Sequence, residues 1–159
     1  MKINYTNRVK LELRKILDSA AQFYVDKLDI SEKIQENLLI NVFVRKGPDR
    51  GACYVNCYPK RLPTEFDIEL YPCELSEMLS SFAHEMIHVK QFATGELRVL
   101  PKCSKWNNQI WQAGSDELDN YYDSPWEIEA YGREEGLYVR FATSHSELIE
   151  EWNDGQEAS

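Results

Sequence analysis

Residues 75–93 carry the pattern that most constrains how this chain can fold. At about 100° per residue, the apolar residues of this segment form one arc of a helix: Leu75, Met78, Leu79, Phe82, Met86 and Val89. His84, His88 and Gln91 fall on the opposite side, and Gly95 is a typical residue to end such a helix. The segment therefore predicts a helix with one face in a hydrophobic core and a polar face turned toward a second surface.

The polar face contains the sequence His-Glu-Met-Ile-His at residues 84–88. Histidines at positions i and i+4 lie about 40° apart on a helix, so both imidazoles can reach one metal ion. Glu85 follows the first histidine directly and can approach a metal-bound water without taking a ligand position. Zinc lowers the pKa of such a water to about 7, and a carboxylate can then remove the proton as general base. We predict a catalytic Zn²⁺ site with His84 and His88 as ligands and Glu85 as the base.

Catalytic zinc generally takes three protein ligands, so a third residue is required. A later helix is predicted to begin at Ser124, where serine is a natural N-cap and is followed by proline. On this helix Glu127 falls inside the apolar arc, whereas Glu129 falls outside it and is placed to form an ion pair with Arg133. A carboxylate that faces inward needs a compensating partner, and a zinc ion is an adequate one. We therefore predict Glu127 as the third ligand.

Several other residues compete with this assignment. Glu129 and Glu134 lie on the same predicted helix, and Glu134 shares the face of Glu127. His145 is the only other histidine of the chain, but it stands in a polar stretch that is typical of a surface. Ser124 and Glu127 also match a capping box, in which the glutamate would bond back to the start of its own helix. The sequence leaves these alternatives open.

The motif at 84–88, followed by Glu127 three residues before Ala130, resembles the gluzincin branch of the zincin metallopeptidases. It is most similar to small minimal forms found in phage and bacterial genomes and to ImmA/IrrE-type peptidases. In those families the glutamate three residues before an alanine is the third zinc ligand, which again implies Glu127. The chain departs from the pattern at Tyr131, where several gluzincins have an acidic or amide residue that orients a histidine. The resemblance covers the two motif helices, about a third of the chain.

The resemblance and the residue patterns together imply an α+β, minimal zincin-like fold. We expect one domain over residues 1–152 and a disordered tail over residues 153–159. The elements that we expect are a helix at 6–28, a three-stranded, mostly antiparallel sheet from 38–45, 52–58 and 65–71, the active-site helix at 75–93, a short hairpin at 106–111, and a C-terminal helix at 124–152 that breaks near Gly136 or Ser144. The strand at 65–71 directly precedes the motif helix, where zincins have an edge strand that adds an extended peptide.

The implied activity is hydrolysis of peptide bonds in a peptide or protein substrate. Tyr121, Tyr122 and Tyr131 lie near the third ligand and are candidates to stabilise the oxyanion. The competing interpretation is a catalytically inactive zincin-like domain that acts as a binding or regulatory module. A protease of DNA-bound proteins, like the SprT group, would call for a third histidine ligand and a basic neighbourhood, and the sequence shows neither.

Composition excludes two further classes of function. The net charge of −9 argues against nucleic-acid binding, which requires basic patches that meet phosphates. No apolar run reaches the length of a membrane span, and the first residues lack a signal-peptide pattern, so we expect a cytoplasmic protein without a membrane partner. A monomer is the default expectation.

Without Cys-x-x-Cys spacing, the four cysteines are expected to be reduced structural thiols: Cys53, Cys57, Cys73 and Cys103.

Overall fold

The chain forms a mixed α/β fold in which helices cover one face of a sheet. The structure, a computed structural model, describes residues 1–6, 9–56, 62–112 and 117–157. In chain order the elements are β1 (Lys2–Tyr5), α1 (Leu11–Lys27), α2 (Glu32–Gln35), β2 (Leu39–Val44), β3 (Gly51–Val55), β4 (Glu65–Leu70), α3 (Leu75–Thr94), β5 (Leu97–Leu100), β6 (Cys103–Trp106), β7 (Gln109–Trp111), α4 (Glu117–Tyr122), α5 (Pro125–Ser144) and α6 (Ser146–Glu157).

The main sheet has four strands in the order β1-β2-β4-β3. β1 runs parallel to β2, β2 runs parallel to β4, and only β3 and β4 are antiparallel. The expectation of a three-stranded, mostly antiparallel sheet is therefore wrong, although all three predicted strands exist. The parallel pairing of β1 and β2 follows from α1, which lies between them and provides the crossover that parallel strands need. The strand β1 was not predicted from sequence, although its four residues, Lys-Ile-Asn-Tyr, alternate between exposed and partly buried positions.

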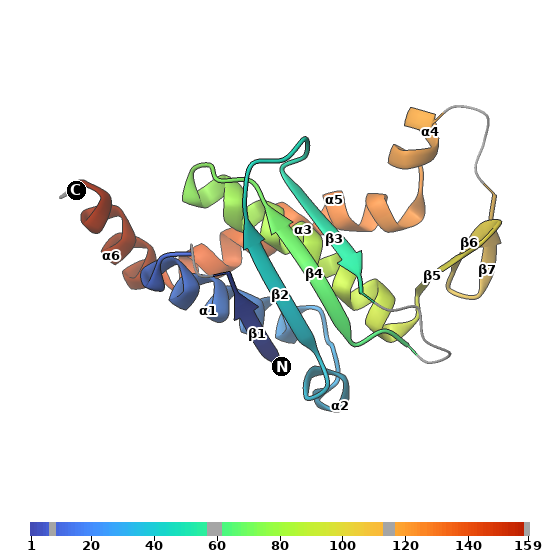
Figure 1. Cartoon of the computed structure of the whole chain (residues 1–159), viewed down its shortest axis with the longest axis horizontal. Helices are drawn as coiled ribbons and strands as arrows, with labels where there is room; N and C mark the ends of the chain where they lie inside the picture. The colour runs from blue at the N-terminus through green and yellow to red at the C-terminus, as the bar shows by residue number, and fades with distance from the viewer. Residues whose placement is uncertain (7–8, 57–61, 113–116, 158–159) are drawn as a thin grey trace.

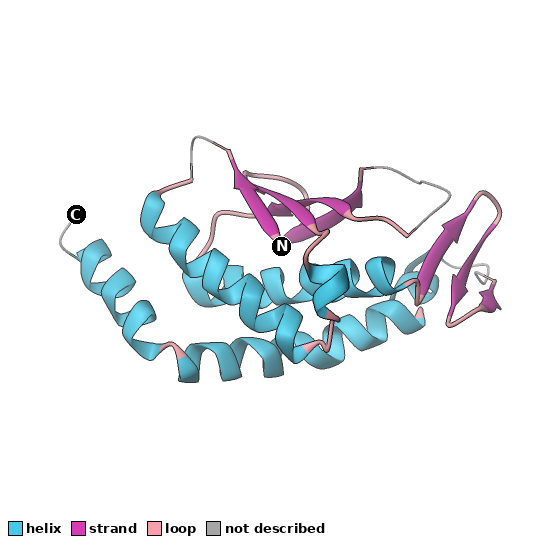
Figure 2. Ribbon diagram, turned by 90° about the horizontal axis from the view of Figure 1, so that it is seen from below, coloured by secondary structure: helices cyan, strands magenta, loops and turns pink. Residues whose placement is uncertain are grey.

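The helices pack against one face of this sheet (Figure 2). Along β4 every second residue is buried, so that Phe66, Ile68 and Leu70 point into the core and the residues between them point away. The core continues into α1, α3 and α5, whose largest fully buried side chains include Tyr24, Phe82 and Phe141. In the described part of the chain, no helix is long and apolar enough to cross a membrane.

A second, antiparallel sheet of β5, β6 and β7 projects from one end of the molecule (Figure 1). The hairpin predicted at 106–111 is confirmed, because β6 and β7 pair through a turn at Asn107 and Asn108. Both asparagines have positive φ angles, 48° and 66°. Two-residue hairpins prefer turns in which both central residues have positive φ. Sequence periodicity does not predict β5 or α4 within this region.

The C-terminal helix breaks at Ser144, one of the two positions at which a break was expected. α5 ends at Ser144, and α6 begins at Ser146 and continues to Glu157. The segment expected as a disordered tail at residues 153–159 is helical as far as Glu157, and residues 158–159 lie outside the described residues. The reason is that Leu148, Ile149 and Trp152 of α6 pack against the core and hold the helix in place.

The three described cysteines, Cys53, Cys73 and Cys103, are free thiols. Cys57 lies outside the described residues. Cys53 lies on β3, where burial raises the pKa of its thiol well above the usual value. The protonated form that this favours is unreactive, as expected of a structural thiol.

Candidate metal centre

Helices α3 and α5 pack side by side in opposite directions and place the predicted site residues between them. α3 buries its predicted apolar arc and ends at Gly95, which adopts a left-handed conformation with φ of 79°. Along the pair, Gln91 of α3 contacts Trp126 of α5, while His84, two turns earlier, contacts Glu134. The polar face of α3 is therefore turned toward α5, the second surface that the sequence implied.

Three donor atoms converge at the centre of this helix pair. The Nε2 atoms of His84 and His88 are 3.1 Å apart. Glu127 approaches both, with its Oε2 3.3 Å from Nε2 of His84 and its Oε1 3.4 Å from Nε2 of His88. All three residues are at least nine-tenths buried, and Glu127 Oε2 accepts no hydrogen bond from the described residues. A buried carboxylate oxygen without a donor calls for a cation, and this group can hold a metal ion.

The acid–base properties of the three residues reflect their proximity. Burial alone would raise the pKa of Glu127, but the two histidines outweigh it and lower this pKa to about 2. Burial alone would lower the pKa of His84, but the carboxylates of Glu127 and Glu134 outweigh it and raise this pKa to about 9. The pKa of His88 is raised for the same reason, through Glu127. The centre thus favours positive charge between its donors, which a proton or a metal ion can provide.

Each histidine is also fixed through its other ring nitrogen. Nδ1 of His84 lies 2.6 Å from Glu134 Oε2, and Nδ1 of His88 lies 2.8 Å from Gln91 Oε1. Such partners orient a histidine ring and set which nitrogen carries the proton. Both Nε2 atoms are thereby left to face Glu127. Glu134, considered from sequence as an alternative ligand, instead contacts the far side of His84.

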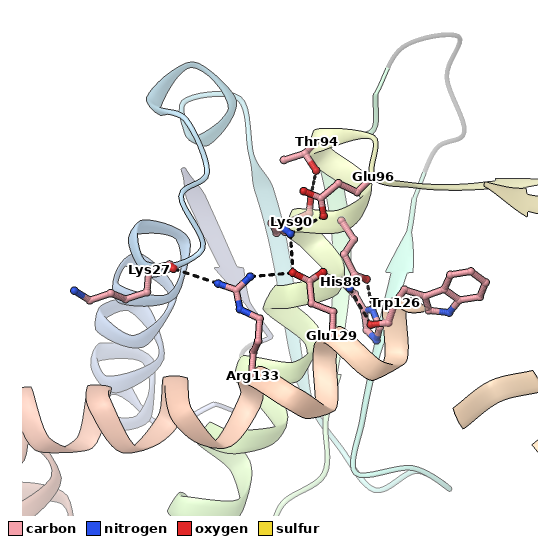
Figure 3. A network of polar contacts seen from close by, with 9 residues as sticks. Lys27, His88, Lys90, Thr94, Glu96, Trp126, Glu129 and Arg133 are labelled. Atoms are coloured by element: carbon pink, nitrogen blue, oxygen red, sulfur yellow. Dashed lines mark hydrogen bonds and ion pairs between the residues drawn. The ribbon is translucent and has the colours of Figure 1, made fainter. Parts of the chain in front are cut away.

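Gln91 links His88 to a larger polar network, in which Figure 3 labels His88, Trp126 and Glu129. The Gln91 side chain is fully buried, and its Nε2 donates to the Trp126 carbonyl at 2.9 Å and to Glu129 Oε2 at 3.0 Å. The other oxygen of Glu129 accepts hydrogen bonds from Lys90 at 2.8 Å and from Arg133 at 2.9 Å. The predicted Glu129–Arg133 ion pair is confirmed. Glu129 thus contacts His88 only indirectly, through Gln91.

Glu85 is buried between the histidines and the edge strand β3. Burial raises its pKa to about 7, against the opposing effect of the two histidines. A carboxyl group with this pKa can both accept and release a proton near neutral pH. Gly51 of β3 lies so close that a Cβ atom there would be 2.6 Å from Glu85 Oε1. The backbone of β3 therefore forms the wall against which the Glu85 carboxylate rests.

The centre opens into a cleft of about 910 Å³ between α3, α5, β3, α4 and β5. His84, His88, Glu85 and Glu127 line it together with the tyrosines that the sequence singled out. The Tyr131 ring lies 4.7 Å from the His84 ring, and the Tyr121 hydroxyl interacts with Tyr131 and with Glu127. Burial and the charge of Glu127 raise the pKa of Tyr121, so this hydroxyl remains a proton donor at neutral pH.

The remaining alternatives do not reach the centre. His145 lies at the opposite end of α5 from Glu127, where its ring stacks on Phe141 with centroids 4.5 Å apart. The capping box does not form, because Ser124 makes no side-chain cap and its hydroxyl donates to the Tyr121 carbonyl instead. The predicted edge strand is also wrong. β4 pairs on both sides, and β3 is the edge strand that borders the cleft.

Three residues contact the histidines or Glu85 in a way that was not predicted from sequence, although each left a signal. Gln91 falls on the same helix face as the histidines, three residues after His88. Glu134 follows Glu127 by two helical turns and so shares its face, which is consistent with a role near His84. Gly51 begins a strand, and a glycine in a strand often marks a close approach of another group.

Comparisons with family models, with curated proteins and with solved structures found no match. The function must therefore be inferred from the geometry of the site.

Proposed function

We propose that this protein is a zinc-dependent metallopeptidase in which Glu85 is the general base. The convergence of His84, His88 and Glu127 carries the proposal, because it places two imidazole nitrogens and a carboxylate oxygen around one point. Two histidines and a glutamate are a ligand set that catalytic zinc takes in hydrolases, with the fourth position free. The open cleft gives a substrate access to that position.

The chemistry divides between the ion and the chain. Bound zinc would polarise the scissile carbonyl and lower the pKa of water. Glu85 is buried beside both histidines and accepts the proton of the attacking water on its carboxylate, then delivers it to the leaving amine. Tyr131 and Tyr121 line the same cleft, and their hydroxyls are donors for the oxygen on which negative charge develops.

The edge strand β3 suits an extended peptide substrate. Among the described residues, β3 pairs with β4 on one side only, which leaves its other edge without a strand partner. Gly51, Ala52 and Cys53 of β3 line the cleft beside Glu85. A peptide that pairs with this edge would be held by main-chain hydrogen bonds and would pass close to the base.

The proposal is tested by incubating zinc-loaded protein with an unfolded protein substrate and with mixed peptides. Cleavage that disappears on removal of zinc and in the Glu85→Gln variant supports a peptidase. Stoichiometric zinc without any cleavage would support the alternative, a zincin-like binding or regulatory module.

Replacing Gly51 by alanine is expected to lower peptidase activity by about 10- to 100-fold while zinc content stays stoichiometric. The added Cβ would lie 2.6 Å from Glu85 Oε1, so the base must move, and small displacements of a catalytic group have effects of this size. Steady-state kinetics and metal analysis on the same preparations measure both quantities. Gly132→Ala is the matched control, because a Cβ at Gly132 meets nothing within 4 Å. Equal activities of the two variants would contradict this role of the β3 wall.

Replacing Gln91 by methionine is expected to weaken zinc binding by about 10- to 100-fold, the usual effect of removing a group that orients a metal ligand. The change removes the 2.8 Å contact with Nδ1 of His88 while keeping a side chain of similar size. Competition with a chelator of known affinity measures the dissociation constant. Gln22→Met on the exposed side of α1 is the control and should bind zinc like the unaltered protein. Unchanged affinity in Gln91→Met would show that His88 is held without Gln91.

A further inference from the structure

The cleft has two chemically different ends, on either side of the candidate metal centre. Because α3 and α5 run in opposite directions, residues that precede His84 on α3 lie beside residues that follow Glu134 on α5. Residues that follow His88 lie beside the start of α5, where Gln91 contacts Trp126. The lining residues can therefore be assigned to one end or the other.

The first end is acidic. Glu77 of α3 and Glu135 of α5 line it and are exposed. The start of β3 lies at the same end, because Gly51 pairs with Leu70 and the Tyr71 amide donates to the Arg50 carbonyl at 2.9 Å, just before α3 begins. The residues that precede β3 add the exposed Asp49. Apart from the histidines, Arg50 is the only basic residue among the described residues that line the cleft. Three carboxylates against one guanidinium give this end a negative potential, in a chain whose net charge is −9.

The second end is apolar. It is lined by Phe92, Leu97, Val99 and Trp126 from the end of α3, from β5 and from the start of α5. Of the described lining residues at this end, none beyond Glu127 carries a charge. A second, smaller cavity of about 440 Å³ shares Trp126 and Tyr121 with this end and is lined by Lys102 and polar residues as well as by apolar ones.

We propose that the cleft selects peptides with a basic residue on one side of the cleaved bond and a large apolar residue on the other. This inference rests on the proposed peptidase function and names its substrate class. A lysine or arginine side chain is attracted by the carboxylates of Glu77, Glu135 and Asp49. A leucine, phenylalanine or similar side chain is removed from water between Val99, Phe92 and Trp126. The centre between the two ends then acts on the bond that joins these two parts of the peptide.

The size of each preference can be anticipated. The carboxylates at the acidic end are exposed, so salt screens them, and their effect is expected to be about 10-fold at low ionic strength and smaller above 0.15 M salt. A buried apolar side chain discriminates by about 10- to 200-fold against a smaller one in enzymes generally. The apolar preference should therefore be the larger of the two and should persist at high salt.

A peptide library digested with the zinc-loaded full chain tests the proposal, with cleavage sites read by mass spectrometry. The expected result is enrichment of lysine and arginine on one side of the cleaved bonds and of large apolar residues on the other. Cleavage without enrichment, or with enrichment of acidic residues, would overturn it. An absence of all cleavage would instead count against the proposed function.

A binding measurement decides the specificity question even without cleavage. Zinc-loaded Glu85→Gln protein is titrated with a fluorescent peptide that has a lysine-rich half and a leucine-rich half, and with a version in which glutamate replaces lysine. Tighter binding of the lysine peptide by about 10-fold at low salt is expected. Equal binding of the two peptides would overturn the proposal, independently of any hydrolysis.

Variants with matched controls locate the two preferences. The double change Glu77→Lys and Glu135→Lys should abolish the preference for lysine, whereas Glu147→Lys with Glu150→Lys on α6 changes the net charge equally and should preserve it. At the other end, Val99→Ser should weaken the apolar preference. Val139→Ser, at a similarly exposed position on α5 outside the cleft, should leave it unchanged. Equal behaviour within either pair would contradict the assignment of that end.

Discussion

Replacing Glu127 by alanine is expected to weaken zinc binding by more than about 100-fold, beyond the range seen when only a supporting residue is lost. The change removes one of three protein ligands and the only one that carries negative charge, and the two histidines alone hold zinc poorly. Glu127→Gln, which keeps the shape of the side chain and removes its charge, should show most of the loss. Metal analysis after gel filtration at micromolar protein concentration measures the effect.

Glu129→Ala is the matched control for this prediction. Glu129 lies on the same helix two residues later, and it bonds to Lys90, Arg133 and Gln91 rather than to the histidines. Because it acts on His88 only through Gln91, its removal should leave stoichiometric zinc at micromolar protein. Loss of zinc in Glu129→Ala together with retention in Glu127→Ala would overturn the assignment of the third ligand. Circular dichroism of the metal-free proteins verifies that both variants are folded.

The helices of the site were predictable because each carries its own periodic signal. The apolar arc of α3 fixes which way His84 and His88 face, and this arc is buried as predicted. The same projection on α5 separates Glu127, which is 5% exposed, from Glu129, which is only partly buried and is paired with Arg133. A helix face is a local property, so a short stretch of sequence determines it.

The sheet and the walls of the cleft depend on contacts between distant residues, which periodicity does not encode. Strand β3 is recognisable as a strand, but nothing within Gly51–Val55 tells that it is the edge and that β4 lies inside. The approach of Gly51 to Glu85 joins residues 34 positions apart, and the contact of His84 with Glu134 joins residues 50 apart. These placements depend on the arrangement of the whole fold, in which β1 pairs with β2 across the α1 connection and the sheet packs on α3.

Replacing Glu85 by glutamine is expected to lower the rate of peptide hydrolysis by about 10²- to 10⁴-fold, the usual contribution of a positioned general base. Glutamine has nearly the same shape but cannot accept the proton. Zinc content should stay stoichiometric, because Glu85 is not among the three residues whose atoms converge. Initial rates with zinc-loaded proteins, compared with Glu147→Gln on α6 as a control, measure the change. Equal rates for Glu85→Gln and the unaltered protein would sink the assignment of the base and favour a binding module.

Replacing Glu85 by glutamine should lower the rate of hydrolysis but raise the stability of the metal-free protein. This combination separates a catalytic role from a structural one. Burial raises the pKa of Glu85 to about 7 in the folded protein, above the ordinary value of 4.5. The unfolded chain therefore loses this proton at lower pH than the folded one. As pH rises from about 4.5 to 7, ionisation of Glu85 in the unfolded chain lowers the free energy of unfolding, and above pH 7 this loss stays constant. Metal-free Glu85→Gln is expected to be more stable than the unaltered protein by about 1–3 kcal/mol at pH 8, and the difference should shrink toward pH 4.5. Denaturant unfolding of the two metal-free proteins at several pH values measures it. A residue that only supports the fold would show the reverse, since its replacement would cost stability at every pH.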